Sequence, residues 1–192
     1  MNFVKLVEKL FFACYCTNEE DLKMPLISQE NATQKDIDLL YETVRIAHEA
    51  KEKGNHPFGA LLADANGNIL LEQGNDHLGG GAAMHAETAL MLKAGKLYSP
   101  EFLSTCSLYT SAEPCVMCCG AMYWTNVRRL VFGITEKQLL FLIGSNDQNP
   151  TFDLPSGEVL SHGQKDMVIV GPVADANLVS AIIEDHLGFW DN

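Results

Sequence analysis

The pattern of apolar and polar residues predicts a helix followed by a β-hairpin in the first half of the chain. Apolar residues recur every three or four positions, the period of a one-faced helix, at Ile37, Leu40, Val44 and Ala47. Two strand-like apolar runs follow at residues 58–63 and 68–72. Asn66 and Gly67 lie between these runs, and an Asn-Gly pair in that position is a strong hairpin signal.

The rest of the chain alternates between helical and strand-like segments. Further helices are expected at residues 82–94, from Pro114 onward, and at residues 174–187. Short apolar runs predict strands at residues 107–110, 127–132 and 167–170. The polar segment 145–161 contains two prolines and is expected to be a loop. This order predicts an α/β fold in which helices cover both faces of a sheet of about five strands.

Size and charge narrow the range of functions. With 192 residues, 47% of them hydrophobic, the chain is long enough for one domain with one core. Its formal net charge is −12, from 25 acidic and 13 basic residues, and the basic residues are scattered. Nucleic-acid-binding proteins usually carry a basic stripe instead. The composition therefore favours a small, uncharged substrate over tRNA or DNA.

The cysteines and the N-terminal segment indicate the cellular compartment in which the protein is expected. Six cysteines are present, but a chain of this length does not need a disulfide framework, so we expect a reducing compartment, the cytoplasm. No apolar run approaches the roughly 18 residues of a membrane span. We divide the chain into an N-terminal extension, helical or disordered, at residues 1–32 and a domain at residues 33–192. Charged residues disfavour a cleaved secretory signal in that extension: Lys5, Glu8 and Lys9.

Two short motifs carry the candidate chemistry. The first contains His85 and Glu87, and the second contains Pro114, Cys115 and Cys118. One imidazole and two thiolates supply three of the four tetrahedral ligands of zinc, and catalytic zinc sites commonly leave the fourth position to water. Either motif alone is weak. Together they match the His-x-Glu and Pro-Cys-x-x-Cys signature of zinc nucleobase deaminases.

Glu87 is the candidate for proton transfer. A carboxylate beside the water can take its proton and deliver it to a leaving amino group. A structural zinc site is the alternative, but it would need a fourth ligand from Cys106 or Cys119. A thiol redox site would leave the histidine and Glu87 without a role.

Residues 34–134 resemble the cytidine deaminase superfamily, in the branch that contains tRNA adenosine deaminases and guanine deaminases. Besides the two motifs, the matching segments are residues 56–60, Asn75, residues 108–113 and residues 120–124. Pro-Phe-Gly-Ala at 57–60 and Tyr-Trp at 123–124 look closer to guanine deaminases. The resemblance implies a cytidine deaminase-like three-layer α/β/α sandwich with a mixed sheet, one Zn²⁺ per subunit and a homodimer.

The resemblance also implies how a substrate is held. By position, Asn75 would hydrogen-bond the substrate ring, and Phe58 and Trp124 would line the base pocket with aromatic faces. The alternative for Asn75 is a turn residue at a strand end. The alternative for Phe58 and Trp124 is ordinary core packing.

The resemblance gives no secure match from Glu136 onward. Members that act on guanine use a further carboxylate and a C-terminal lid from this region. The candidates for the carboxylate are Asp153 and Glu158, and the candidate for the lid is the segment 186–190 at the end of the last helix. That segment could instead anchor the C-terminus or form a dimer contact.

The expected function is zinc-dependent hydrolytic deamination of a free purine base, with guanine favoured, to xanthine and ammonia, or of a related amino-heterocycle. Two enzymatic alternatives stay open, namely a tRNA adenosine-to-inosine deaminase and a deaminase of cytosine or another small base. A zinc-stabilised binding subunit is the non-enzymatic alternative. The net charge argues against tRNA, and Glu87 argues against a pure binding subunit.

Overall fold

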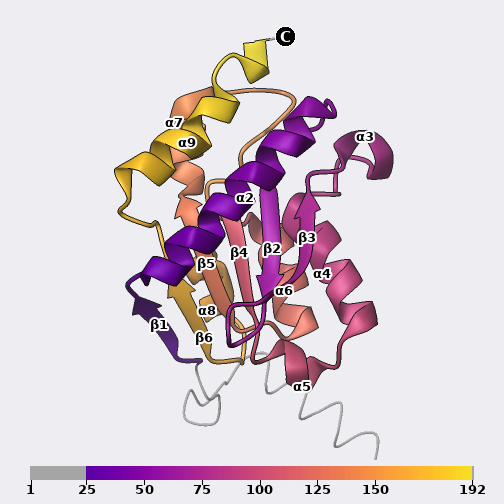
Figure 1. Cartoon of the computed structure of the whole chain (residues 1–192), viewed down its shortest axis with the longest axis vertical. Coiled ribbons are helices and arrows are strands. Elements are labelled where there is room, and N and C mark those ends of the chain that lie inside the picture. Colours follow the sequence, from indigo (N-terminus) through magenta and orange to yellow (C-terminus); the bar gives the residue numbers. More distant parts are fainter. Residues whose placement is uncertain (1–24, 192) are drawn as a thin grey trace, which may run out of the picture.

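The computed structural model describes residues 25–191 and has a six-stranded mixed sheet at its centre (Figure 1). The strand order is β1-β6-β5-β4-β2-β3. The first four strands in this order are parallel to one another, whereas β2 is antiparallel to both β4 and β3. The strands are Ile27–Glu30 (β1), Gly59–Ala63 (β2), Ile69–Gly74 (β3), Ser107–Ala112 (β4), Arg129–Ile134 (β5) and Met167–Val170 (β6).

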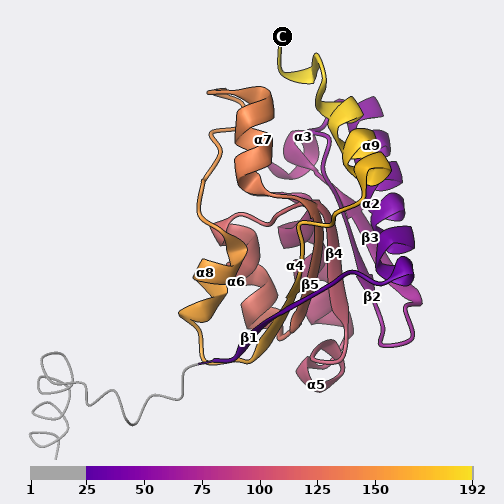
Figure 2. The same cartoon turned by 90° about the vertical axis from the view of Figure 1, so that its left-hand side faces the viewer.

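Helices cover both faces of this sheet, which confirms the predicted three-layer α/β/α class (Figure 2). One face carries α2 (Gln34–Glu52) and α9 (Ala176–His186); the other carries α4 (Ala86–Leu97), α6 (Val116–Thr125) and α8 (Ser156–Ser161). A buried apolar cluster lies on each side of the sheet. The remaining helical segments are α3 (His77–Gly80), α5 (Pro100–Leu103), α7 (Glu136–Ile143) and the 3₁₀ turn Phe189–Asp191. None of the helices within residues 25–191 is long and apolar enough to cross a membrane.

The predicted hairpin is formed by β2 and β3. Asp64 Oδ1 accepts backbone hydrogen bonds from Asn66 (2.9 Å) and Asn68 (2.8 Å). Gly67 has a positive φ of 76°, a conformation that glycine adopts without a steric penalty. The turn therefore depends on Asp64 as well as on the Asn-Gly pair. Within the sheet, the fully buried strand β2 also pairs with β4, whose end leads into the cysteine motif.

Besides the short segments α3, α5 and the 3₁₀ turn, three elements differ from the sequence-based expectation. β1 is a four-residue edge strand that adds a sixth strand to the five or so expected, and the folded unit thus begins before residue 33. α7 was not predicted, although Thr135 and Gln138 form a capping box at its start. α8 lies within the expected loop at residues 145–161. The expected helical or disordered extension comprises residues 1–32, and its residues 1–24 lie outside the described residues.

A buried carboxylate joins the first long helix to the sheet. Asp36 belongs to the N-terminal capping box of α2, where its backbone N–H donates to Thr33 Oγ1 at 3.2 Å. Its carboxylate accepts hydrogen bonds from Arg129 on β5 at 2.9 and 3.0 Å and from the Tyr109 hydroxyl on β4 at 2.8 Å. Burial opposes ionisation, but hydrogen bonds from Arg129, Thr33 and Tyr109 outweigh it and hold the pKa of Asp36 well below its usual range.

We expect Asp36→Asn to lower the free energy of unfolding by roughly 2 kcal/mol at neutral pH, because it removes one partner of a largely buried ion pair and half of a capping box. Since the folded-state pKa is depressed, this stabilisation is present above the ordinary aspartate pKa and is lost progressively as the pH falls below about 4. Urea unfolding of both proteins at about pH 7 and about pH 3 measures the difference. A difference that did not shrink at the lower pH would contradict this account of Asp36.

Candidate active site

Two neighbouring helix starts bring the three predicted metal ligands together. His85 is the N-cap residue of α4, and Cys115 is the N-cap residue of α6. Cys118 lies within the first turn of α6 and is fully buried. His85 and Cys115 therefore each precede their helix by one residue, whereas the sequence pattern predicted that both lie inside the first helical turn. The positive end of a helix dipole stabilises thiolates in these positions.

The three side chains fit a zinc ion. His85 Nδ1 lies 3.6 Å from Cys115 Sγ and 3.7 Å from Cys118 Sγ, and the three ligand atoms all lie within 4.8 Å of one another. A tetrahedral zinc ion with bonds of about 2.05 Å to nitrogen and about 2.3 Å to sulfur separates these atoms by about 3.6 Å. In the described part of the chain, this cluster has three members. It could thus hold zinc with one position left over.

The two cysteines differ in charge state. The hydrogen bond with Cys115, and then burial, raise the pKa of Cys118, so this thiol would give up its proton on binding a metal. Hydrogen bonds with the Cys118 thiol and with the His85 ring lower the pKa of Cys115 to about 4, although burial opposes this shift. Cys115 is therefore a thiolate at neutral pH, which is the form in which cysteine binds metals. Cys119 faces elsewhere, because its thiol donates to the Pro114 carbonyl oxygen at 3.4 Å.

Glu87 is held rigidly beside the ligand cluster. Its Oε1 accepts a hydrogen bond from the Thr110 hydroxyl on β4 at 2.7 Å, and its Oε2 accepts one from the Cys118 thiol at 3.3 Å. The residue is only 5% exposed, and burial raises the pKa of its carboxyl group. A raised pKa makes the carboxylate a stronger base toward water than an exposed glutamate is.

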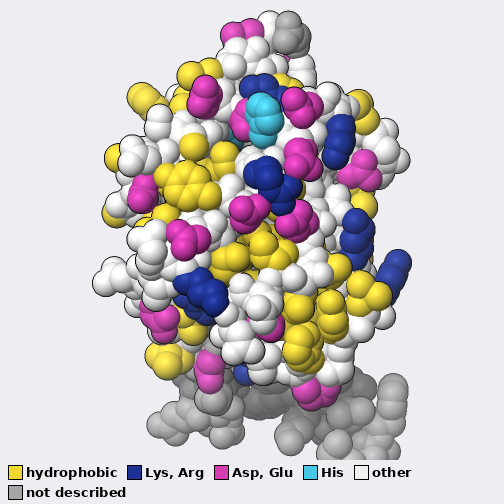
Figure 3. All heavy atoms as spheres, in the orientation of Figure 1, with side chains coloured by type: hydrophobic (Ala, Val, Ile, Leu, Met, Phe, Trp, Pro, Cys, Tyr) yellow, Lys and Arg dark blue, Asp and Glu magenta, His cyan; other side chains and the backbone are white. Residues whose placement is uncertain are grey.

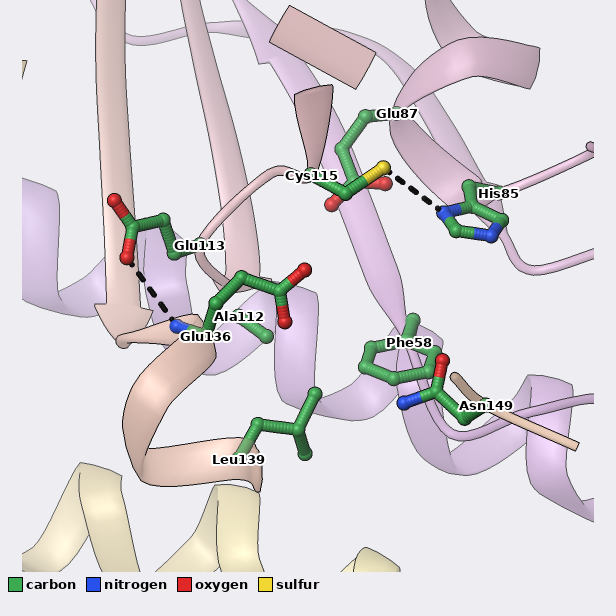
Figure 4. A pocket seen from close by; sticks show the side chains of 9 residues that line it. All are labelled: Phe58, His85, Glu87, Ala112, Glu113, Cys115, Glu136, Leu139 and Asn149. Atoms are coloured by element: carbon green, nitrogen blue, oxygen red, sulfur yellow. Dashed lines mark hydrogen bonds between the residues drawn. The ribbon is translucent and has the colours of Figure 1, made fainter. Parts of the chain in front are cut away.

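A small cavity opens onto these residues (Figure 4). About 320 Å³ of space lies between its lining atoms, open solvent at the mouth included, and about 30 Å³ of this admits the centre of a water molecule. Four residues selected from the sequence line it, namely Phe58, His85, Glu87 and Cys115. The others in its lining are Ala112, Glu113, Glu136, Leu139 and Asn149.

The other proposed substrate contacts do not line this cavity. Asn75 is buried after β3, where its Oδ1 accepts the backbone N–H of His77 at 2.9 Å as a turn residue does. Trp124 is 81% exposed on α6. Asp153 and Glu158 are both exposed, since the segment that contains them runs over the surface before and along α8. The roles of all four residues as substrate contacts remain predictions, and the geometry of this single chain does not support them.

Two buried carboxyl groups line the cavity that the sequence did not single out. Glu113 accepts hydrogen bonds from the Ser156 backbone N–H (2.8 Å), the Ser156 hydroxyl (2.7 Å) and the Glu136 backbone N–H (3.2 Å). Glu113 thereby joins the cysteine motif to the starts of α7 and α8. Burial, and then negative charge at Cys115 and Glu87, raise the pKa of Glu136 to about 8. Both residues follow the ends of parallel strands, where α/β proteins commonly bind their ligands. The predicted strands at residues 107–110 and 127–132 could therefore have pointed to them.

The C-terminal segment packs behind Phe58. The Trp190 ring centroid lies 6.2 Å from that of Phe58, and the His186 ring lies 5.2 Å from it. Trp190 Nε1–H donates to His186 Nδ1 at 3.2 Å, and the Asn146 side-chain amide donates to the Trp190 carbonyl oxygen at 3.0 Å. The segment 186–190 is thus anchored within its own chain, and its role as a lid remains a prediction.

Residues 33–134 match the family model of the cytidine and deoxycytidylate deaminase zinc-binding region. The chain belongs to this family. A probable cytosine deaminase of Schizosaccharomyces pombe is 34% identical over 165 residues, which cover 86% of this chain and 98% of the relative. A guanine deaminase of Bacillus subtilis is 35% identical over 94 residues, which cover 48% of this chain and 60% of the relative.

Solved structures show the same fold. A guanine deaminase from Nitrosomonas europaea superposes with a TM-score of 0.61 at 21% identity, over 85% of this chain and 87% of that protein. Together with the family match, this confirms the resemblance found in the sequence. The family binds zinc and consists of hydrolases that act on C–N bonds, so the chain is a zinc deaminase of the nucleobase or nucleoside type.

Proposed function

We propose that the protein hydrolyses the exocyclic amino group of a free nucleobase, releasing ammonia and leaving a ring carbonyl. The observation that carries this proposal is the position of the buried Glu87 beside three metal-ligating side chains at the end of a small cavity. His85, Cys115 and Cys118 would hold the zinc ion. When bound, zinc would acidify a water molecule and make it a nucleophile at neutral pH.

The protein's own residues account for proton transfer and for positioning. Glu87 would remove one proton from the attacking water and hand it to a ring nitrogen. It would then carry the second proton of the added hydroxyl group to the amino group, which departs as ammonia as the ring carbonyl forms. The Thr110 hydroxyl fixes the carboxyl group for these transfers. Phe58 and Leu139 provide apolar walls against which a planar ring can pack, and they keep bulk water from the reacting carbon.

Cytosine is the base that we propose first. The cytosine deaminase-like relative matches this chain beyond the zinc-binding region, into the C-terminal part that contributes α7 and Asn149. Guanine, which the residue pattern favoured, is the second candidate, because the Bacillus subtilis guanine deaminase is 35% identical over the 94 residues that it matches. That similarity covers only about half of this chain.

A tRNA substrate is disfavoured. The chain carries a formal charge of −12, and on the face shown in Figure 3 the Lys and Arg side chains lie scattered among Asp and Glu. Binding to a polyphosphate backbone requires many phosphate contacts from a continuous basic surface. We expect no shift of tRNA in a gel assay at physiological salt.

Location in the cytoplasm and a homodimer are also part of the proposal. Cys106, Cys115, Cys118 and Cys119 are free thiols in the described part of the chain, which supports a reducing compartment. Met117 and Trp124 are exposed along α6, 37% and 81% respectively, and support a dimer contact there. Sedimentation of the zinc-loaded protein measures the oligomeric state.

Ammonia release by the zinc-loaded protein tests the proposed function. The panel contains cytosine, guanine and adenine, together with cytidine and guanosine. We expect one free base to be hydrolysed with a kcat/KM at least about tenfold above that of its nucleoside, because the cavity is small. Preference for a nucleoside, or no ammonia from any of these compounds, would reject the proposal.

A further inference from the structure

Thr88 follows Glu87 in α4 and has no part in the chemistry assigned so far. It lies three residues after His85, and residues at this spacing share one face of a helix. α4 packs against α6, and the Thr88 hydroxyl oxygen lies 3.2 Å from Cys118 Sγ. The start of α4 thus holds one proposed metal ligand, the proposed proton carrier and a hydroxyl group in contact with a second proposed ligand.

The Thr88 hydroxyl is the donor in this contact. The Cys118 thiol has one proton, and it donates this proton to Glu87 Oε2 at 3.3 Å. The sulfur can therefore only accept a hydrogen bond from Thr88. When Cys118 binds a metal, it gives up its proton, because the thiolate is the form that binds. The hydrogen bond from Thr88 then runs to a negatively charged sulfur and becomes stronger for that reason.

The local backbone leaves the Thr88 hydroxyl available for the sulfur. Threonine hydroxyls within helices commonly donate to a backbone carbonyl oxygen three or four residues earlier. Thr125 in α6 does so, to the carbonyl oxygens of Ala121 (2.8 Å) and Met122 (3.1 Å). In the described part of the chain, the Thr88 hydroxyl bonds to Cys118 and to no backbone carbonyl. It is therefore directed at the sulfur of a proposed ligand.

A donor at this position matters because Cys118 is shielded from solvent. Its exposed fraction is 0%, so bulk water does not reach the sulfur. A buried negative charge is costly unless hydrogen-bond donors compensate it. The other side chains that contact this sulfur are His85 and Cys115, which would face the metal, and the carboxylate of Glu87. Among the described residues, Thr88 is thus the side-chain donor that a Cys118 thiolate would have.

We propose that Thr88 is a positioning residue of the metal centre, which donates a hydrogen bond to the Cys118 thiolate and thereby strengthens zinc binding. Groups that hydrogen-bond to metal ligands fix the orientation of the ligand and tune its basicity. The inference rests on the proposed ligand set and function, and it adds a determinant of metal retention outside the ligands. Thr88 does not line the cavity, so this role does not involve contact with the substrate.

Three variants separate this role from ordinary packing. Thr88→Val keeps the shape of the side chain and removes the hydroxyl group, whereas Thr88→Ser keeps the hydroxyl group and removes the methyl group. Thr125→Val is the matched control, because the Thr125 hydroxyl also contacts a sulfur, that of Met91 at 3.2 Å, which is not a proposed ligand. Competition with a chromogenic chelator gives the zinc dissociation constant, and calorimetry gives the thermal midpoint with and without zinc.

We expect Thr88→Val to raise the zinc dissociation constant by about 10- to 100-fold, Thr88→Ser to raise it by less than about threefold, and Thr125→Val to leave it unchanged. Without zinc, the thermal midpoint of Thr88→Val should be close to that of wild type. With zinc it should be lower, since a ligand that binds more weakly stabilises the folded state less. In cobalt-substituted Thr88→Val, the thiolate-to-cobalt absorption band should move to longer wavelength, because a thiolate without a donor gives up electron density more readily.

The role of Thr88 and the proposed function fail in different ways. A change of less than about tenfold in the zinc dissociation constant of Thr88→Val would overturn the role of Thr88. Equally weak binding by Thr88→Ser, or an equal loss of thermal stability with and without zinc, would also overturn it, because packing would then be the cause. If wild type binds zinc but releases no ammonia from any base, the proposed function fails, and the zinc affinities still decide the role of Thr88. A wild-type protein that binds no zinc would overturn both.

Discussion

Glu87→Ala is expected to retain zinc and to lose almost all ammonia release. The variant keeps His85, Cys115 and Cys118 and removes the one carboxyl group that is both buried beside them and hydrogen-bonded in place by Thr110. General acid–base catalysis contributes about 10²- to 10⁴-fold to a rate, so we expect kcat to fall by about 10³-fold or more. Ammonia release and metal analysis of the same preparation measure the two properties.

The thiol contact of Glu87 makes a second variant necessary. Cys118 donates to Glu87 Oε2, so the alanine variant could perturb the cluster indirectly. Glu87→Gln keeps the shape of the side chain and its contact with Thr110 but cannot remove a proton from water. We expect it to be as inactive as Glu87→Ala. Substantial activity in the zinc-loaded glutamine variant would refute the assignment of Glu87 as the proton carrier.

Cys115→Ser is expected to lose zinc, activity and stability together. Serine at this position supplies a hydroxyl group that stays protonated near neutral pH, whereas the Cys115 thiol has a pKa of about 4 and is ionised. Because metal binding is coupled to folding, losing the ion should also lower the thermal midpoint, and added zinc should restore little of it. Metal analysis after dialysis and scanning calorimetry with and without zinc measure these effects.

Cys119→Ser is the matched control for this prediction. The residue is adjacent to a ligand and fully buried, but its thiol donates to the Pro114 carbonyl oxygen and faces away from the cluster. A serine hydroxyl can make the same hydrogen bond. We therefore expect zinc content like that of wild type. A Cys115→Ser protein that binds a full equivalent of zinc, or a Cys119→Ser protein that binds none, would contradict the ligand set.

The sequence could indicate which side chains lie together at the proposed metal site, because their signals are local. His85 and Glu87 lie two residues apart at one helix start, and Cys115 and Cys118 lie one turn apart at another. Such short spacings fix which side chains share a helix end before any tertiary structure is known. Only the packing of α4 against α6, which brings the two helix starts together, depends on the tertiary fold.

The rest of the site depends on contacts that are distant in the sequence. Glu136 and Asn149 reach the cavity because β5 pairs with β4 and because the segment after α7 returns across the site. Trp124 has the right residue type but lies on a helix side that faces solvent in this chain. Asp153 was a reasonable candidate by charge, but it is exposed, whereas Glu113 and Glu136, which line the cavity, are buried and follow strand ends.

The fold shows the same division between local and distant signals. The hairpin has a clear turn sequence between two apolar runs, and the long helix α2 has strong periodicity and an N-terminal cap; both were predicted. β1 has four residues at an edge of the sheet and is held by pairing with β6, which lies far along the chain. Nothing in its own pattern distinguishes it from a loop. For α7, the capping box was present, but the surrounding apolar run also fits a strand.

Hydrolysis in water enriched in heavy oxygen tests the central claim most directly. The zinc-loaded protein is incubated with cytosine, and with guanine in parallel, and the products are analysed by mass spectrometry while ammonia is measured. The account predicts one ammonia per product molecule and one heavy oxygen atom at the carbon that carried the amino group, with no reaction in Glu87→Ala. Unchanged bases, or a product that contains no oxygen from the solvent, would contradict it.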